Sequence, residues 1–121
     1  MNYQKAAAPF VKEKFIRAND AFSANNNELG FKFLEDAHVL GQYSTYWHTL
    51  AHIKMLKHGW KRRDLKEVSG QVFRIIGALT KTAIGLLPDG NTGGANVSPF
   101  KSMPISSENA VKLKKIKSAH S

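Results

Sequence analysis

The feature of this sequence that most constrains its fold is the spacing of its apolar residues, which recur at three- and four-residue steps in four separate segments. Such spacing places apolar side chains along one face of an α-helix, because a helix completes one turn every 3.6 residues. The pattern predicts helices over residues 3–24, 28–40 and 44–58, and a fourth from about residue 64 to Pro88. The chain is therefore predicted to be all-α, with four main helices.

Residues that favour helix ends stand at the borders of these segments. Asn27, Ser44 and Asp64 have side chains that cap the first turn of a helix, and Gly41 and Gly59 stand where the second and third helices are expected to end. Short connections join neighbouring helices as antiparallel hairpins. The prediction is a bundle or a tetratricopeptide-like arrangement, although the chain has no repeat of fixed period.

The character of the chain changes after the fourth helix, whose apolar stripe is long. From about residue 88 to residue 107, glycine and proline indicate turns and extended chain, predicted to lie back across the helices and close the domain. Residues 1–107 are thus predicted to form a single domain. The lysine-rich stretch 108–121 is predicted to be a flexible basic tail or a short surface helix. The apolar stripe of the fourth predicted helix comprises Leu65, Val68, Val72, Ile75, Ile76, Leu79 and Ala83.

Composition excludes several classes of protein. The 121 residues include no cysteine, so disulfides, thiolate metal sites and cysteine nucleophiles are excluded. No apolar run approaches the roughly 20 residues that span a bilayer, and the N-terminus does not resemble a secretory signal, so the expected location is the cytoplasm. No catalytic set of residues stands out, and an enzyme is not predicted.

Two stretches, residues 34–42 and residues 90–100, resemble domain-of-unknown-function family 3703, a bacterial family without an assigned activity. The likeness extends from about residue 5 to Ile105 and leaves the lysine-rich tail outside. The resemblance implies no catalytic residues. Because family members are associated with gene neighbourhoods for transition-metal resistance, it adds slightly to an expectation of metal chemistry.

A glutamate and three histidines form a candidate metal site in the middle of the chain. Glu35 and His38 are three residues apart on the second predicted helix, and His48 and His52 are four apart on the third, so each pair shares a helix face. If the two helices form a hairpin, these four side chains converge on a site suited to zinc, nickel, copper or ferrous iron. The alternative is that the histidines are buried structural residues with ordinary hydrogen-bond partners.

Two further groups are candidate binding residues. Lys61, Arg62 and Arg63 form a basic turn suited to phosphate or an acidic partner, and Asn91 and Asn96 lie in a glycine-rich loop that is either a structural turn or a ligand contact. The net charge of +9 favours anionic partners in general, but no nucleic-acid-binding motif is present, so nucleic acid is not the expected partner. The alternative function is a helical adaptor that binds a protein or an acidic polymer, or pairs as a homodimer, without metal.

Overall fold

The structure, a computed structural model, describes residues 2–84 and 104–120 and contains five α-helices in these ranges, with no strand among them. The all-α prediction is confirmed. Residues 88–103 of the predicted extended segment lie outside the described residues. None of the described helices is long and apolar enough to cross a membrane. The helices are α1 (Tyr3–Ser23), α2 (Asn27–Gly41), α3 (Thr45–Lys61), α4 (Leu65–Ile84) and α5 (Ser107–His120).

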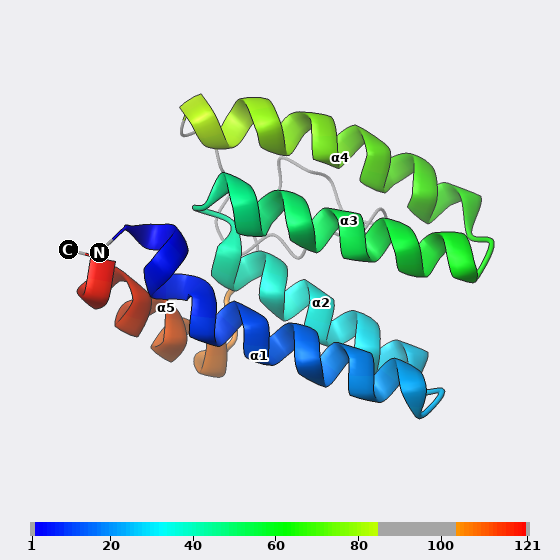
Figure 1. Cartoon of the computed structure of the whole chain (residues 1–121), viewed down its shortest axis with the longest axis horizontal. Helices are drawn as coiled ribbons and strands as arrows, with labels where there is room; N and C mark the ends of the chain where they lie inside the picture. Colours follow the sequence, from blue (N-terminus) through cyan, green and yellow to red (C-terminus); the bar gives the residue numbers. More distant parts are fainter. Residues whose placement is uncertain (1, 85–103, 121) are drawn as a thin grey trace.

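The first four helices form two antiparallel hairpins, as Figure 1 shows. Helix α1 packs along α2, and α3 packs along α4, while contact between α2 and α3 joins the hairpins. Helix α5 returns to lie against α1 and α2, close to the start of the chain. Among the described helices, α4 packs only on α3. Helix α2 thus lies between two packing surfaces.

A side-chain cap begins each of the five described helices, and Ser106 caps α5 by accepting from the amide of Asn109 at 3.2 Å. The Oδ1 atom of Asn2 accepts from the amide of Lys5 at 2.8 Å, and Ser44 and Asp64 cap α3 and α4 as predicted. The cap of α2 is Asn26, so the prediction of Asn27 was wrong by one residue. The helix begins one residue earlier because Asn25 takes the left-handed conformation, with φ 60°, and completes the turn.

Two glycines predicted to follow helix ends lie inside helices instead. A Cβ atom on Gly41 would lie 2.6 Å from Cβ of Trp47, and one on Gly59 would lie 3.2 Å from Cγ of Glu67. Both glycines therefore permit close approach of the next helix rather than a left-handed turn. The left-handed residue after α3 is Arg63, with φ 55°.

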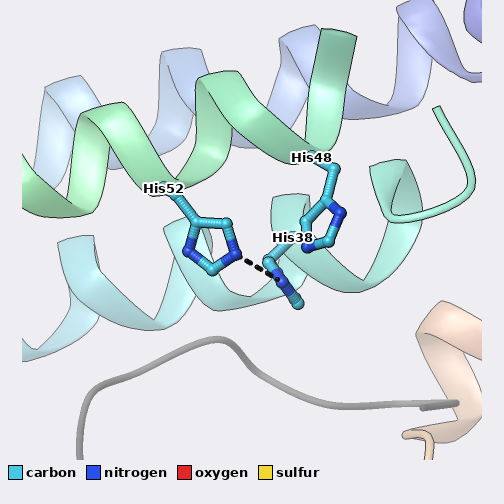
Figure 2. Close-up of side chains that lie close together, drawn as sticks. All are labelled: His38, His48 and His52. Atoms are coloured by element: carbon cyan, nitrogen blue, oxygen red, sulfur yellow. Dashed lines mark hydrogen bonds between the residues drawn. The ribbon is translucent and has the colours of Figure 1, made fainter. Parts of the chain in front are cut away.

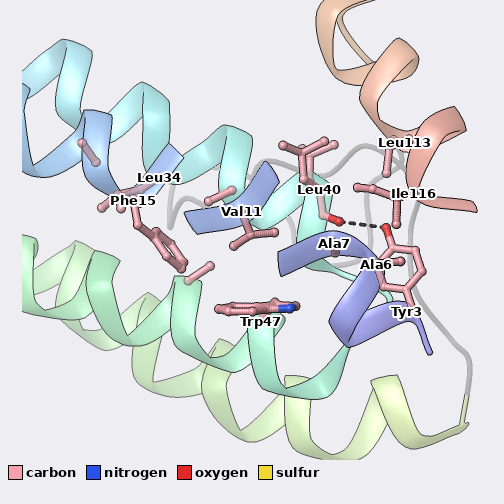
Figure 3. Close-up of a cluster of buried hydrophobic side chains, with 14 of the residues drawn as sticks. Tyr3, Ala6, Ala7, Val11, Phe15, Leu34, Leu40, Trp47, Leu113 and Ile116 are labelled. Carbon is pink, nitrogen blue, oxygen red and sulfur yellow. Dashed lines mark hydrogen bonds between the residues drawn. The ribbon is translucent and has the colours of Figure 1, made fainter. Parts of the chain in front are cut away.

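The hydrophobic core lies between α1, α2, α3 and α5, as Figure 3 shows. Two polar groups in this core have hydrogen-bond partners. Nε1 of Trp47 donates to the backbone oxygen of Gln4 at 2.7 Å, and the hydroxyl of Tyr3 donates to the backbone oxygen of Leu40 at 2.8 Å. Burial raises the pKa of Tyr3, so its hydroxyl remains a donor. The most deeply buried apolar side chains are Ala7, Val11, Ala18, Leu34, Ala37, Leu40, Ala51, Met55 and Ile116.

The C-terminal stretch differs from the sequence prediction of a flexible tail. Residues 107–120 form α5, which buries Leu113 and Ile116 in the core. The sequence prediction allowed a flexible tail or a short surface helix, and the structure has the helix. The abundant lysines obscured its two buried apolar residues, which are three apart and share one helix face. The lysines between them, Lys114 and Lys115, are exposed.

Helix α4 also presents a different face from the one its apolar stripe suggested. Val72, Ile76 and Leu79 are 47%, 63% and 55% exposed, whereas Gln71 and Arg74 are buried against the rest of the molecule. A polar stripe of α4 therefore faces inward. Because this stripe lies against α3 and Gln71 contacts His52, it is part of the candidate site.

Candidate metal centre

Three buried histidines converge between α2 and α3, as Figure 2 shows. His38 comes from α2, and His48 and His52 come from α3. One ring nitrogen of each lies within 4.8 Å of the other two. The closest pair is Nε2 of His38 and Nε2 of His52, at 3.1 Å.

The hairpin between α2 and α3 produces this convergence. His48 and His52 are one turn apart on α3, so both rings project from the same face. The short connection after Gly41 turns α3 back along α2, and the Ser44 cap sets where α3 begins. His38, near the end of α2, then lies opposite both rings, with ring centroids 4.7 and 4.6 Å from those of His48 and His52.

A chain of hydrogen bonds determines the tautomer of His52. The Nε2 group of Gln71 donates to Oε1 of Glu67 at 3.3 Å, and because a carboxylate only accepts, the amide oxygen of Gln71 faces the other way. That oxygen lies 2.6 Å from Nδ1 of His52, which must therefore carry a proton. Nε2 of neutral His52 is left with a lone pair, which accepts from Nε2 of His38.

The surroundings of His52 keep its ring neutral. Burial lowers the pKa of His52 to about 4, the nearby charge of Arg74 lowers it as well, and the hydrogen bond to Gln71 opposes them. The ring is therefore uncharged at neutral pH. A neutral imidazole is the form that binds a metal ion.

The spacing of the two closest nitrogens suits a metal ion as well as a hydrogen bond. Two nitrogens that each lie about 2.0–2.1 Å from a tetrahedral zinc ion are roughly 3.3 Å apart. The 3.1 Å between the Nε2 atoms of His38 and His52 needs little adjustment to reach that value. To bind a metal, His38 must move its proton from Nε2 to Nδ1, and this tautomer change leaves the ring neutral.

The structure does not place Glu35 with the three histidines. Among the described residues, the group of converging donor atoms contains only His38, His48 and His52. Glu35 is half-buried and lines a cleft between α2 and the turn from α3 to α4.

Sequence reasoning missed the contribution of α4. Glu67, Gln71 and Arg74 recur at four- and three-residue steps and thus form a polar stripe. The spacing was visible, but a polar stripe beside an apolar one ordinarily indicates a solvent-facing surface. The structure reverses this assignment because the stripe faces a polar histidine cluster rather than an apolar core.

The predicted basic turn lies apart from the histidines. Lys61, Arg62 and Arg63 are exposed at the end of α3, and Arg62 also lines the cleft that contains Glu35. The cleft has a volume of about 980 Å³. The other candidate binding residues, Asn91 and Asn96, lie outside the described residues.

Comparison with known proteins gives one match. No curated protein and no solved structure matches this chain. Residues 5–113 match the family described as protein of unknown function (DUF3703). The match ends in α5, eight residues beyond Ile105, where the resemblance seen in the sequence ends. Since the match covers most of the chain, this protein belongs to the DUF3703 family.

Proposed function

We propose that this protein binds one divalent transition-metal ion through His38, His48 and His52, as an accessory metal-binding protein. The observation that carries this proposal is the convergence of three buried imidazole nitrogens within 4.8 Å of one another. Three like lone-pair donors at one point provide the ligands of a metal ion, with a fourth position open to water or to a ligand from another molecule.

The donor chemistry limits the metals. Imidazole suits zinc, copper, nickel and ferrous iron, whereas magnesium and calcium require oxygen ligands, which this group of three lacks. Burial strengthens the selection, because a strongly hydrated ion must lose its water to reach the site.

The three rings also contact one another directly. The hydrogen bond between His38 and His52 satisfies one nitrogen on each ring, and it does not require a third imidazole. His48 nevertheless packs against both rings, with its centroid 4.9 Å from that of His52. Metal binding accounts for all three histidines together.

The test is isothermal titration of metal-stripped protein with zinc, nickel and copper ions. We expect one ion per chain, and a loss of affinity of at least about 100-fold when His48→Gln and His52→Gln are combined. His58→Gln is the matched control, since His58 is on the same helix but stacks on Phe22 outside the cluster. Absence of binding by the wild-type protein, or full binding by the folded double variant, would overturn the proposal.

A second candidate function, a helical adaptor, is favoured by the exposed apolar face of α4. Phe73 is 59% exposed and Ile76 is 63% exposed, and Val72 and Leu79 extend the same face. Contiguous exposed apolar side chains favour contact with another protein chain. If this face joins two copies, sedimentation velocity will show a dimer that Ile76→Lys converts to a monomer, and a wild-type monomer at all concentrations would exclude self-association.

A further inference from the structure

Gln71 contacts His52 at the ring nitrogen that faces away from the cluster. Its amide oxygen lies 2.6 Å from Nδ1 of His52, and both side chains are buried. Nε2 of the same ring faces His38, so the two nitrogens of His52 have different partners. Gln71 thereby controls which nitrogen of His52 offers a lone pair to the cluster.

We infer that Gln71 is a positioning residue that makes the metal site exchangeable, because it directs Nε2 of His52 toward the metal without supplying negative charge. This inference rests on the proposed metal site. A histidine ligand commonly donates its second N–H to a carboxylate, which both orients the ring and strengthens its lone pair. A neutral amide supplies only the orientation.

The orientation of the amide is itself determined by a neighbouring residue. Glu67 lies one turn earlier on α4 and accepts from Nε2 of Gln71, so the oxygen of Gln71 is held toward His52. The carboxylate is therefore present in the chain of contacts but is separated from the imidazole by an amide. In the part of the chain that the structure describes, the hydrogen-bond partners of His52 are Gln71 and His38, and neither is a carboxylate.

A positive charge near the site also lowers the expected affinity for a metal cation. Arg74 is buried on α4, and its positive charge opposes additional positive charge at His52. Three neutral imidazoles do not neutralise a divalent ion, and a buried charge that is incompletely compensated is costly. The ion is thus held by directed lone pairs in surroundings that lower its affinity, which suits a protein that receives a metal and releases it.

The decisive variant is Gln71→Glu, which replaces the amide with a carboxylate of the same length. Zinc affinity is measured by competition with a fluorescent chelator, and release is followed by stopped flow with excess chelator. We expect Gln71→Glu to bind zinc at least about tenfold more tightly and to release it correspondingly more slowly. Gln4→Glu is the matched control, since it adds the same charge at an exposed position of α1 and is expected to leave both quantities unchanged.

A second variant, Gln71→Leu, removes the acceptor and is expected to weaken zinc binding about 10- to 100-fold. Nitrogen NMR of the metal-free protein gives an independent readout: the proton of His52 lies on Nδ1 in the wild type, and this preference is lost in Gln71→Leu. Zinc binding by the wild type that neither Gln71 variant alters overturns this inference alone. Absence of metal binding by the wild type overturns the proposed function and this inference with it.

Discussion

Helix α2 contributes to two polar clusters, a partly exposed one facing α1 and α5 and a buried one facing α3. In the first, Nζ of Lys14 lies 2.7 Å from a carboxylate oxygen of Glu108 and 3.4 Å from one of Asp36, so opposite charges meet. In the second, His38 and His52 meet at 3.1 Å beside His48, so side chains of one kind meet.

The difference shows how a polar cluster can indicate its role. Opposite charges neutralise one another, so the Lys14 cluster joins three helices and needs no partner from outside the chain. Several imidazole nitrogens that offer lone pairs at one place are instead suited to bind a metal cation from solution. The lysine cluster is therefore predicted to contribute stability, and the histidine cluster is predicted to contribute binding.

The largest expected effect is stabilisation by metal through the histidine cluster. With free zinc at 1,000 times its dissociation constant, the free energy of unfolding should rise by about 4 kcal/mol, because the unfolded chain lacks the site. Urea unfolding with and without zinc measures this rise. The combined His48→Gln and His52→Gln variant should show no rise, and a similar rise in that variant would place the metal elsewhere.

Loss of Lys14 should have the next largest effect, and should affect stability alone. Lys14→Ala removes a buried cation and its buried stem, while Lys32 still contacts Asp36 and Lys112 still contacts Glu108. We therefore expect the free energy of unfolding to fall by about 2 kcal/mol. Urea unfolding of metal-free protein measures the fall, with Lys12→Ala, an exposed lysine of α1, as control. Zinc affinity should be unchanged, and a parallel loss of affinity would show that the two clusters are coupled.

Mild acid should destabilise the histidine cluster before it affects the lysine cluster. The pKa of His52 is lowered from 6.5 to about 4, so between these values the unfolded chain binds more protons than the folded one. This stability is complete above pH 6.5 and is lost as the pH falls toward 4. We expect a loss of about 2 kcal/mol between pH 7.5 and pH 5 in metal-free protein, measured by urea unfolding.

The control for this pH dependence is His52→Gln, which should flatten the dependence in that range. His58, whose pKa burial also lowers, contributes in the same direction and leaves a smaller slope. Hydrogen bonds from Lys14 and Lys112 lower the pKa of Glu108 to about 2, so its carboxylate stays charged at pH 5. An unchanged slope in His52→Gln would contradict the assignment of the acid sensitivity to the histidine cluster.

The smallest expected effect comes from a second lysine that contacts the same carboxylate as Lys14. Nζ of Lys32 lies 3.6 Å from Asp36, but its side chain is 65% exposed, whereas that of Lys14 is 3% exposed. We expect Lys32→Ala to change the free energy of unfolding by no more than about 0.5 kcal/mol. An effect as large as that of Lys14→Ala would show that burial does not distinguish the two ion pairs.

Sequence periodicity predicted the helices well because helical spacing is a local property of the chain. The four main helices lie close to their predicted positions, and the caps at Ser44 and Asp64 were visible as residue types. The same spacing placed each histidine on a helix face. It could not show that Glu35 lies outside the converging group, since that depends on how α2 and α3 are rotated against one another.

Residue types and their spacing were enough to predict that the chain is helical and where most of its helices begin, and they exclude thiolate metal ligands. The packing of the helices, in contrast, places Gln71 and Arg74 near His52 and brings α5 into the core. The physical reason is that periodicity defines the faces of a helix, whereas the contact between two helices depends on packing across the whole domain. A polar stripe thus faces inward where another polar group meets it.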